Sequence, residues 1–197
     1  MGASMGKGRL EAFSDGVIAI IITIMVLELR PPEAPTLEAL RPVVPVFLAY
    51  VLSFINLGIY WNNHHHMLHA TRSVTGGILW ANLHLLFWLS LFPVVTRWVG
   101  EAPMTALPAA AYGGVAIMAA VAYTILSRFI IQHEGPASTL ARATGKDWKG
   151  WISLACYVAG LLLSFISPLI AYGMYVLVAA IWFLPDRRIE RVIAEKT

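Results

Sequence analysis

Six stretches of mostly apolar residues alternate with short polar segments along this chain. They cover residues 12–29, 43–66, 76–98, 106–131, 148–166 and 169–184. A helix needs roughly 20 such residues to cross the hydrocarbon core of a bilayer. Proline ends or separates several stretches, because it cannot continue a helix: Arg30-Pro31-Pro32 follows the first, and Ser167-Pro168 leaves only a tight hairpin between the last two. The pattern predicts six membrane-spanning helices in one domain over residues 1–197.

The composition supports this fold class. Hydrophobic residues make up 58% of the chain and charged residues only 13%, whereas soluble domains are about half apolar and a quarter charged. We therefore expect an all-α integral membrane protein surrounded by a lipid bilayer. Lys and Arg exceed Asp and Glu by only 14 to 11, and no basic patch alternates with aromatic residues, so no nucleic-acid partner is expected.

The basic residues predict the orientation of the chain in the membrane. Six spans place both termini on one side, and eleven of the 14 basic residues fall on that side. They are Lys7, Arg9, Arg72, Arg128, Arg142, Lys146, Lys149, Arg187, Arg188, Arg191 and Lys196, whereas Arg30, Arg41 and Arg97 fall on the other. Cytoplasmic loops carry the excess of Lys and Arg, so we expect a cell-membrane protein with both termini in the cytoplasm. Asp15 interrupts the first stretch, and no A-x-A-like site follows, so we expect no cleaved signal peptide.

Polar side chains from three predicted helices come to one depth near the cytoplasmic side. These are Ser14 and Asp15 in the first stretch, residues 62–69 in the second, and Trp80, Asn82 and His84 in the third. A carboxylate in lipid costs several kcal/mol unless donors satisfy it, and Asn, His and Trp are donors. We interpret the cluster as a buried polar latch that ties the first helix to the second and third.

The same cluster leaves two functional alternatives open. Histidine titrates near neutral pH, so the cluster is also compatible with a proton-sensing group. His65 and His69 are spaced i, i+4 on one helix face, a spacing that can bind zinc. No cysteine and few carboxylates lie nearby, so no metal site is predicted.

A stripe of bulky apolar residues follows another face of the first predicted helix. At about 100° per residue, Ile20, Ile24 and Leu27 share this stripe, Thr23 lies on its flank, and Asp15 points roughly 140° away from Ile20. Lipid or ordinary helix packing would account for such a stripe. Thr23, however, has little reason to face lipid.

The start of this helix carries a pattern that is known from a channel family. Arg9, Phe13, Ser14 and Asp15 form R-x-x-x-F-S-D, which resembles the bacterial branch of the endolysosomal potassium channel family called transmembrane protein 175. The segments W-N-N-H-H at 61–65 and L-W-A-N-L-H at 79–84, together with the six-span layout, are also similar to that family. The resemblance covers essentially the whole chain.

The resemblance implies a homotetramer whose pore is lined by the first helix of each subunit, without a re-entrant T-V-G-Y-G filter loop. It implies a narrowest ring at Ile20, a polar pore position at Thr23 and an outer apolar ring at Leu27, with Ile24 between them. Arg9, Phe13, Ser14, Asp15, Trp80, Asn82 and His84 are then the residues of the motif and of helix packing. The implied function is a potassium-permeable cation channel with modest selectivity for K+ over Na+, no catalytic residue and no cofactor beyond the permeating ion.

Other functions stay open at this point. Glu28 forms either an acidic ring at the outer mouth or a solvated charge at the helix end. A proton-permeable pore is a variant of the main hypothesis. A small secondary transporter would show a broken helix or inverted repeats, and neither is visible. A membrane metalloenzyme would need many ligands, but this chain has six histidines, four of them within 64–69.

Overall fold

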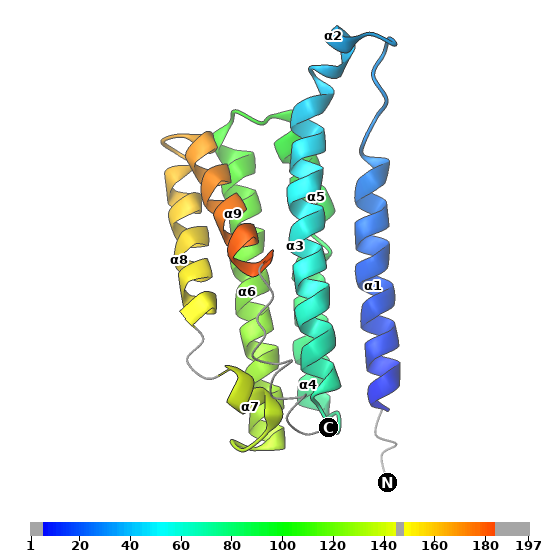
Figure 1. Cartoon of the computed structure of the whole chain (residues 1–197), viewed down its shortest axis with the longest axis vertical. Coiled ribbons are helices and arrows are strands. Elements are labelled where there is room, and N and C mark those ends of the chain that lie inside the picture. Colours follow the sequence, from blue (N-terminus) through cyan, green and yellow to red (C-terminus); the bar gives the residue numbers. More distant parts are fainter. Residues whose placement is uncertain (1–5, 145–147, 184–197) are drawn as a thin grey trace.

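The computed structural model describes residues 6–144 and 148–183, and the regular elements within these ranges are all helices. In chain order they are α1 (Lys7–Leu27), α2 (Leu37–Leu40), α3 (Val43–His69), α4 (Gly76–Leu89), α5 (Phe92–Glu101), α6 (Ala106–Glu134), α7 (Thr139–Thr144), α8 (Trp148–Leu163) and α9 (Pro168–Phe183). The long helices run beside one another, with α1 at one edge of the bundle and α8 at the opposite edge (Figure 1).

Each of the six predicted apolar stretches is helical. Four described segments are long and apolar enough to cross a membrane: Lys7–Leu27, Val43–His69, Gly76–Glu101 and Ala106–Glu134. The helices α8 and α9 are apolar but shorter, at 16 residues each. They are joined by the tight turn predicted at Ser167-Pro168, since α9 begins at Pro168. The predicted end of the last stretch at Leu184 lies outside the described residues.

The third apolar stretch differs from its prediction, because it is not one continuous helix. It breaks at Ser90-Leu91 into α4 and α5. Pro93, in the first turn of α5, has no N–H to donate to the carbonyl of Leu89, and its ring would clash with that carbonyl in a straight helix. The Leu91 N–H reaches back to Trp88 O at 3.3 Å instead, which tightens the last turn of α4. After this break, α5 continues along α1 and α3.

The core of the bundle forms around α6, which contacts α4 and α5 on one side and α8 and α9 on the other. Its buried positions are rich in small residues, among them Ala109, Gly113 and Ala116. Small residues let membrane helices approach closely. Tyr175 of α9 uses this space: its hydroxyl donates to Ala109 O at 2.9 Å, and a Cβ on Gly113 would collide with that hydroxyl. Close packing therefore holds the α8–α9 hairpin against α6.

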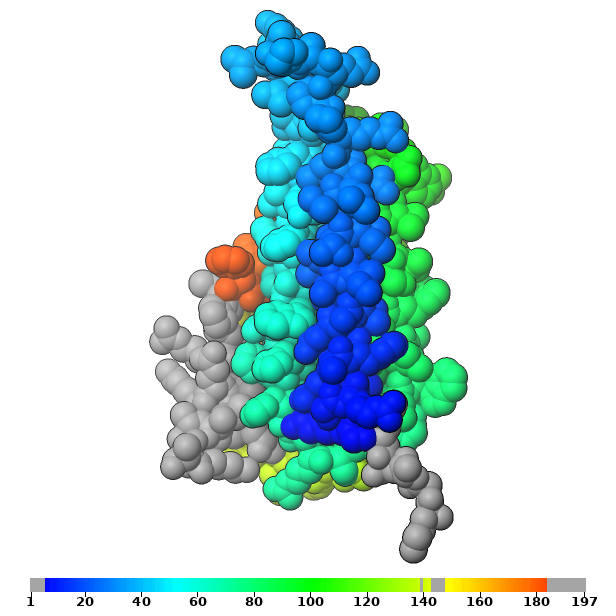
Figure 2. Space-filling view, turned by 90° about the vertical axis from the view of Figure 1, so that its right-hand side faces the viewer, coloured from blue at the N-terminus to red at the C-terminus, as the bar shows by residue number. Residues whose placement is uncertain are grey.

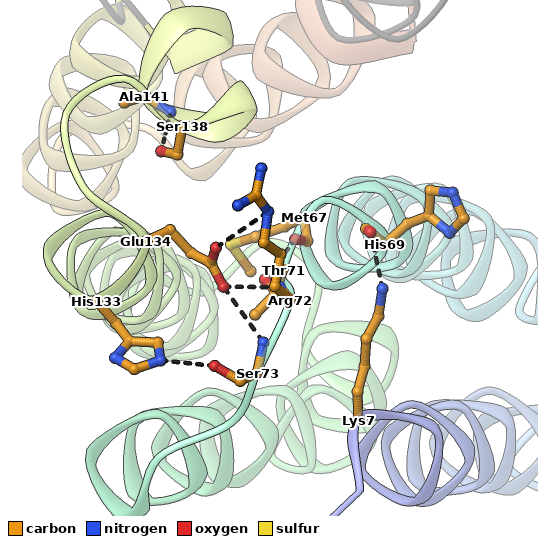
Figure 3. A network of polar contacts seen from close by, with 10 residues as sticks. All are labelled: Lys7, Met67, His69, Thr71, Arg72, Ser73, His133, Glu134, Ser138 and Ala141. Atoms are coloured by element: carbon orange, nitrogen blue, oxygen red, sulfur yellow. Dashed lines mark hydrogen bonds and ion pairs between the residues drawn. The ribbon is translucent and has the colours of Figure 1, made fainter. Parts of the chain in front are cut away.

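One end of the bundle is held together by a buried carboxylate. The Glu134 side chain, only 7% exposed, accepts hydrogen bonds from the N–H groups of Arg72 at 2.7 Å and Ser73 at 3.3 Å, as Figure 3 shows. His133 is hydrogen-bonded to the Ser73 hydroxyl at 2.8 Å. These contacts attach the loop between α3 and α4 to the end of α6. At the same end, Lys7 of α1 donates to His69 O at 2.8 Å.

The helix α1 is covered by its own subunit on one side only. It contacts α3, α4 and α5. Figure 2 shows α1 running along the face of the molecule between α3 on one side and α4 and α5 on the other. The remaining side of α1 is therefore free to meet lipid, water or another protein.

Candidate functional site

The two faces of α1 differ in chemistry as well as in burial. The buried face repeats at helical spacing and consists of Leu10, Ser14, Ile18, Ile21 and Met25. The exposed face holds the predicted stripe: Ile20 is 58% exposed, Ile24 45% and Leu27 77%, and Thr23 is exposed among them. The subunit thus leaves uncovered the same four residues that the resemblance implies as pore-lining.

Thr23 is the one polar side chain in this stripe. Its hydroxyl donates to Ile20 O, one turn earlier, at 2.9 Å. A hydroxyl whose proton is directed to the helix backbone keeps its oxygen lone pairs available as acceptors. Thr23 therefore presents an electron-rich oxygen on an otherwise apolar surface, which is a suitable ligand for a monovalent cation.

The opposite face of α1 is fixed by a chain of three buried hydrogen bonds. Ser14 is 0% exposed, Asn82 0% and His64 1%, and they come from α1, α4 and α3. His64 Nε2 lies 2.7 Å from Asn82 Oδ1, Asn82 Nδ2 donates to Ser14 Oγ at 2.9 Å, and Ser14 Oγ donates to Leu10 O at 2.9 Å. Because Asn82 Oδ1 only accepts, His64 carries its proton on Nε2. The predicted polar latch exists, with these three residues as its buried part.

Asp15 joins the latch differently from the prediction. Its side chain is half-buried rather than enclosed, and its Oδ1 accepts a hydrogen bond from Trp61 Nε1 of α3 at 3.0 Å. The indole of Trp61 is 44% exposed. The carboxylate is thus paired at the surface of the subunit, which avoids the full desolvation cost of a buried charge.

The histidines beyond Trp61 form a stack along α3. His65 stacks on Trp61 with ring centroids 6.0 Å apart, and His69 stacks on His65 at 6.2 Å. Within the described ranges, no group of three or more His, Cys, Asp or Glu side chains is arranged to hold a metal ion. The arrangement therefore gives no support to the metalloenzyme alternative.

Four of the predicted motif and packing residues lie away from the latch. Arg9 is exposed, Phe13 is 52% exposed and Trp80 is 75% exposed. His84 accepts a hydrogen bond from Trp88 Nε1, one turn further along its own helix, at 2.9 Å. Among the described residues, neither the Arg9 nor the His84 side chain forms a hydrogen bond or ion pair with another helix.

A second polar network, which the sequence analysis missed, lies deeper in the bundle. Ser53 of α3 lies 2.6 Å from the Thr96 hydroxyl of α5 and donates to the Tyr112 hydroxyl of α6 at 3.2 Å. Asn56 of α3 donates to the same Tyr112 oxygen at 3.0 Å. Polar residues within apolar stretches are the signal that would have found it, since hydroxyls and amides in membrane helices seek partners on neighbouring helices. The network ties α3, α5 and α6 into the scaffold behind α1.

A cluster of charged side chains lies at the other end of α1. Glu28 follows the last turn of α1, and its Oε2 lies 3.4 Å from Arg97 Nη1 of α5. Arg97 also donates from Nε to Glu101 Oε1 at 2.9 Å. Neither the acidic ring nor the solvated charge that the sequence leaves open for Glu28 includes this contact with Arg97. Sequence spacing does not reveal it, because spacing does not show that α5 lies beside α1.

Comparison with known proteins places this arrangement in a family. The family described as endosomal/lysosomal potassium channel TMEM175 matches residues 9–93. A protein named as a potassium channel from Chryseobacterium sp. (strain P1-3) is 56% identical over 191 residues, which span 97% of this chain and 100% of that protein.

The fold is similar to a solved structure as well. The crystal structure of a lysosomal potassium-selective channel TMEM175 homolog from Chamaesiphon minutus matches with a TM-score of 0.76 and 27% identity, covering 91% of this chain and 97% of that one. The endosomal/lysosomal proton channel TMEM175 of Homo sapiens is 36% identical over an alignment of 86 residues that covers 36% of this chain and 17% of that protein. The chain belongs to the TMEM175 family, in its bacterial branch.

Proposed function

We propose that four copies of this chain form a potassium-permeable channel whose pore is lined by the outward face of α1. The observation that carries this proposal is the stripe of Ile20, Thr23, Ile24 and Leu27, which its own subunit leaves exposed while the Ser14 latch fixes the other face of the helix. Its bacterial relatives are named as potassium channels, which supports the same function.

The proposed subunit crosses the membrane six times and keeps both termini in the cytoplasm of the cell. In this arrangement α4 and α5 together form one span, and α8 and α9 form the last two. The distribution of Lys and Arg along the sequence supports this orientation, since most of them occur in segments that the six-span layout predicts to be cytoplasmic. Glu28 then lies at the outer mouth of the pore and the Ser14 latch near its inner end.

In the proposed pore, Ile20 is the constriction. A ring of four isoleucine side chains offers an ion no ligand and closes by dewetting, so conduction requires a ring wide enough for partly hydrated ions. The Thr23 oxygens, one turn further out, replace some of the lost water. K+ holds its water less tightly than Na+, so the pore favours K+, but modestly, because it has one ring of hydroxyls rather than layers of carbonyls.

The experiment that tests this function is reconstitution in liposomes with reversal potentials measured under K+ and Na+ gradients. The wild-type channel is expected to conduct K+ in preference to Na+. Ile20→Asn places a polar group in the constriction and is expected to raise the leak and weaken selectivity. Val26→Asn is the matched control, because Val26 is 44% exposed on α1 but lies about 120° around the helix from Ile20.

Four outcomes would count against the proposal. Absence of ion current from well-folded protein would remove the channel function, and saturable uptake driven by a counter-ion would favour a secondary transporter. An unchanged reversal potential in Ile20→Asn, or equal effects of Ile20→Asn and Val26→Asn, would remove Ile20 from the constriction.

Proton permeation is the second candidate function. The specific observation in its favour is that the human relative is named as a proton channel. A pH-sensitive dye inside the liposomes measures this flux when a pH gradient is the only driving force. Acidification that Ile20→Asn accelerates would assign protons to the same pore, whereas a constant internal pH would exclude them.

A further inference from the structure

The cluster formed by Glu28, Arg97 and Glu101 is built so that one cation serves two carboxylates. Arg97 contacts Glu28 at 3.4 Å across the α1–α5 interface and Glu101 at 2.9 Å within α5. The side chains are 33%, 49% and 59% exposed for Glu28, Arg97 and Glu101. The three groups therefore leave one net negative charge that water and ions reach directly.

The position of Glu28 explains why the cluster needs Arg97. Glu28 is the C-cap residue of α1, where the last carbonyl groups give the helix end a partial negative charge. A carboxylate is unfavourable at this end, and a cation close to it is favourable. Arg97 supplies that cation from the neighbouring helix, and Glu101, one turn along α5, keeps the guanidinium in place.

The cluster also stands directly beside the proposed conduction path. Glu28 follows Leu27, the most exposed residue of the α1 stripe at 77%. In the channel proposed above, each subunit therefore contributes one such cluster to the mouth of the pore. A fixed charge at a mouth changes the local concentration of the permeating ion.

We propose that Arg97 sets the supply of K+ at the outer mouth by neutralising Glu28, so that it determines conductance without lining the pore. This inference rests on the proposed channel function. Removing the guanidinium raises the negative charge of each cluster from one to two, and removing the Glu28 carboxylate lowers it to zero. Arg97 is a positioning residue for Glu28 as well, because it holds the carboxylate against α5.

The test is the inward unitary K+ conductance of single channels, recorded at about 10 mM and about 1 M K+, where the Debye length is roughly 30 Å and 3 Å. At low salt, Arg97→Gln is expected to raise the inward conductance about twofold or more, because one charge about 8 Å away in water attracts a cation by roughly RT and each of the four subunits adds one such charge. Glu28→Gln is expected to lower it by a similar factor. At high salt both variants are expected to match the wild type.

The matched control is Glu38→Gln. Glu38 carries the same charge on α2, the short helix that projects beyond the bundle at the same end (Figure 1), outside the α1–α5 contact that holds the cluster. Its low-salt conductance is expected to change much less than that of Glu28→Gln, because its charge lies further from the mouth. A purely structural role of Arg97 would change channel yield or open probability at both salt concentrations, without the opposite signs of the two variants.

The outcomes separate this inference from the function on which it depends. If the wild type carries no K+ current, the proposed function fails. If the wild type conducts but Arg97→Gln and Glu28→Gln change the conductance equally at both salt concentrations, or in the same direction, the role of Arg97 is wrong. Should Arg97→Gln fail to assemble, Glu28→Gln alone decides, and an unchanged low-salt conductance overturns the proposal.

Discussion

The hydrogen bond between Asn82 and Ser14 is the contact on which the orientation of α1 depends most directly. We predict that Ser14→Ala and Asn82→Ala destabilise the protein in a coupled manner. Ser14→Ala removes this bond and the bond from Ser14 Oγ to Leu10 O, and it leaves one Nδ2–H of the buried Asn82 without an acceptor. Asn82→Ala removes the bond to Ser14 too, and also leaves the Nε2–H of His64 without its acceptor in a site that is 1% exposed.

The magnitude follows from the two kinds of loss. Interhelical hydrogen bonds in membrane proteins contribute about 0.6 kcal/mol on average and about 1.7 kcal/mol at most. An unsatisfied buried donor costs about 1–3 kcal/mol. We therefore expect Ser14→Ala to lower the free energy of unfolding by about 1–3 kcal/mol and Asn82→Ala by about 2–4 kcal/mol, because each leaves one buried donor without its acceptor. The double variant is expected to lose less than the sum, by the energy of the shared bond.

The assay is reversible unfolding of the purified protein in mixed micelles by titration with dodecyl sulfate. A double-mutant cycle isolates the Ser14–Asn82 coupling, because the cavity left by each alanine cancels in the difference. Thr105→Ala is the control partner for Asn82→Ala, since Thr105 is the N-cap residue of α6 and has no part in the latch. The losses of unfolding free energy caused by these two substitutions are expected to add. A Ser14–Asn82 coupling as small as the control coupling would refute the latch.

Two further predictions use the same unfolding assay. Gly113→Ala is expected to lower the free energy of unfolding by about 1–3 kcal/mol despite the better helix propensity of alanine, because the new Cβ collides with the Tyr175 hydroxyl. The control is Gly58→Ala, whose Cβ would meet no atom within 4 Å. Equal effects of the two variants would disprove the close α6–α9 packing. Glu134→Ala is expected to lower the free energy of unfolding by about 1.5–3 kcal/mol, because two backbone N–H groups lose a charged acceptor. Loss of the exposed Glu38 carboxylate is expected to change it very little. Similar effects of the two variants would show that other contacts hold the loop between α3 and α4.

The positions of the helices were predictable because length and hydropathy determine them. A run of about 20 apolar residues has few alternatives to a helix in lipid, where each backbone polar group must be satisfied internally. The break at Ser90-Leu91 was less predictable, because proline is tolerated in membrane helices and its effect depends on the neighbouring helices. Hydropathy also gave no sign of α2 and α7, which are short and lie in polar segments.

The sequence predicted that a polar latch joins α1 to α3 and α4. It did not predict which residues of the polar cluster form the buried hydrogen bonds. Depth along the spans brought Ser14, Asn82 and His64 to one level, yet depth does not tell which side of a helix each residue faces. Rotation about the helix axis decides this, and it placed Asn82 in the contact and turned His84 towards Trp88. The contact between Arg97 and Glu28 was not predictable either, since the two residues are distant in sequence.

The exposed stripe of α1 followed from periodicity, because a helix packed on one side has an opposite face that repeats at 3.6 residues. The assembly determines what covers that face of α1, and the structure of a single chain does not show the assembly. Lipid, a pore axis and a neighbouring subunit all suit Ile20 and Ile24. Thr23 and the named relatives favour the pore.

The central claim is that four α1 helices meet at one axis with Ile20 nearest to it. An experimental structure of the purified assembly in lipid nanodiscs measures this directly, as the distance of each α1 side chain from the symmetry axis. We expect a fourfold assembly in which Ile20 lies closest to the axis and Val26 lies away from it. A monomer, or an assembly in which Ile20 faces lipid, would contradict it.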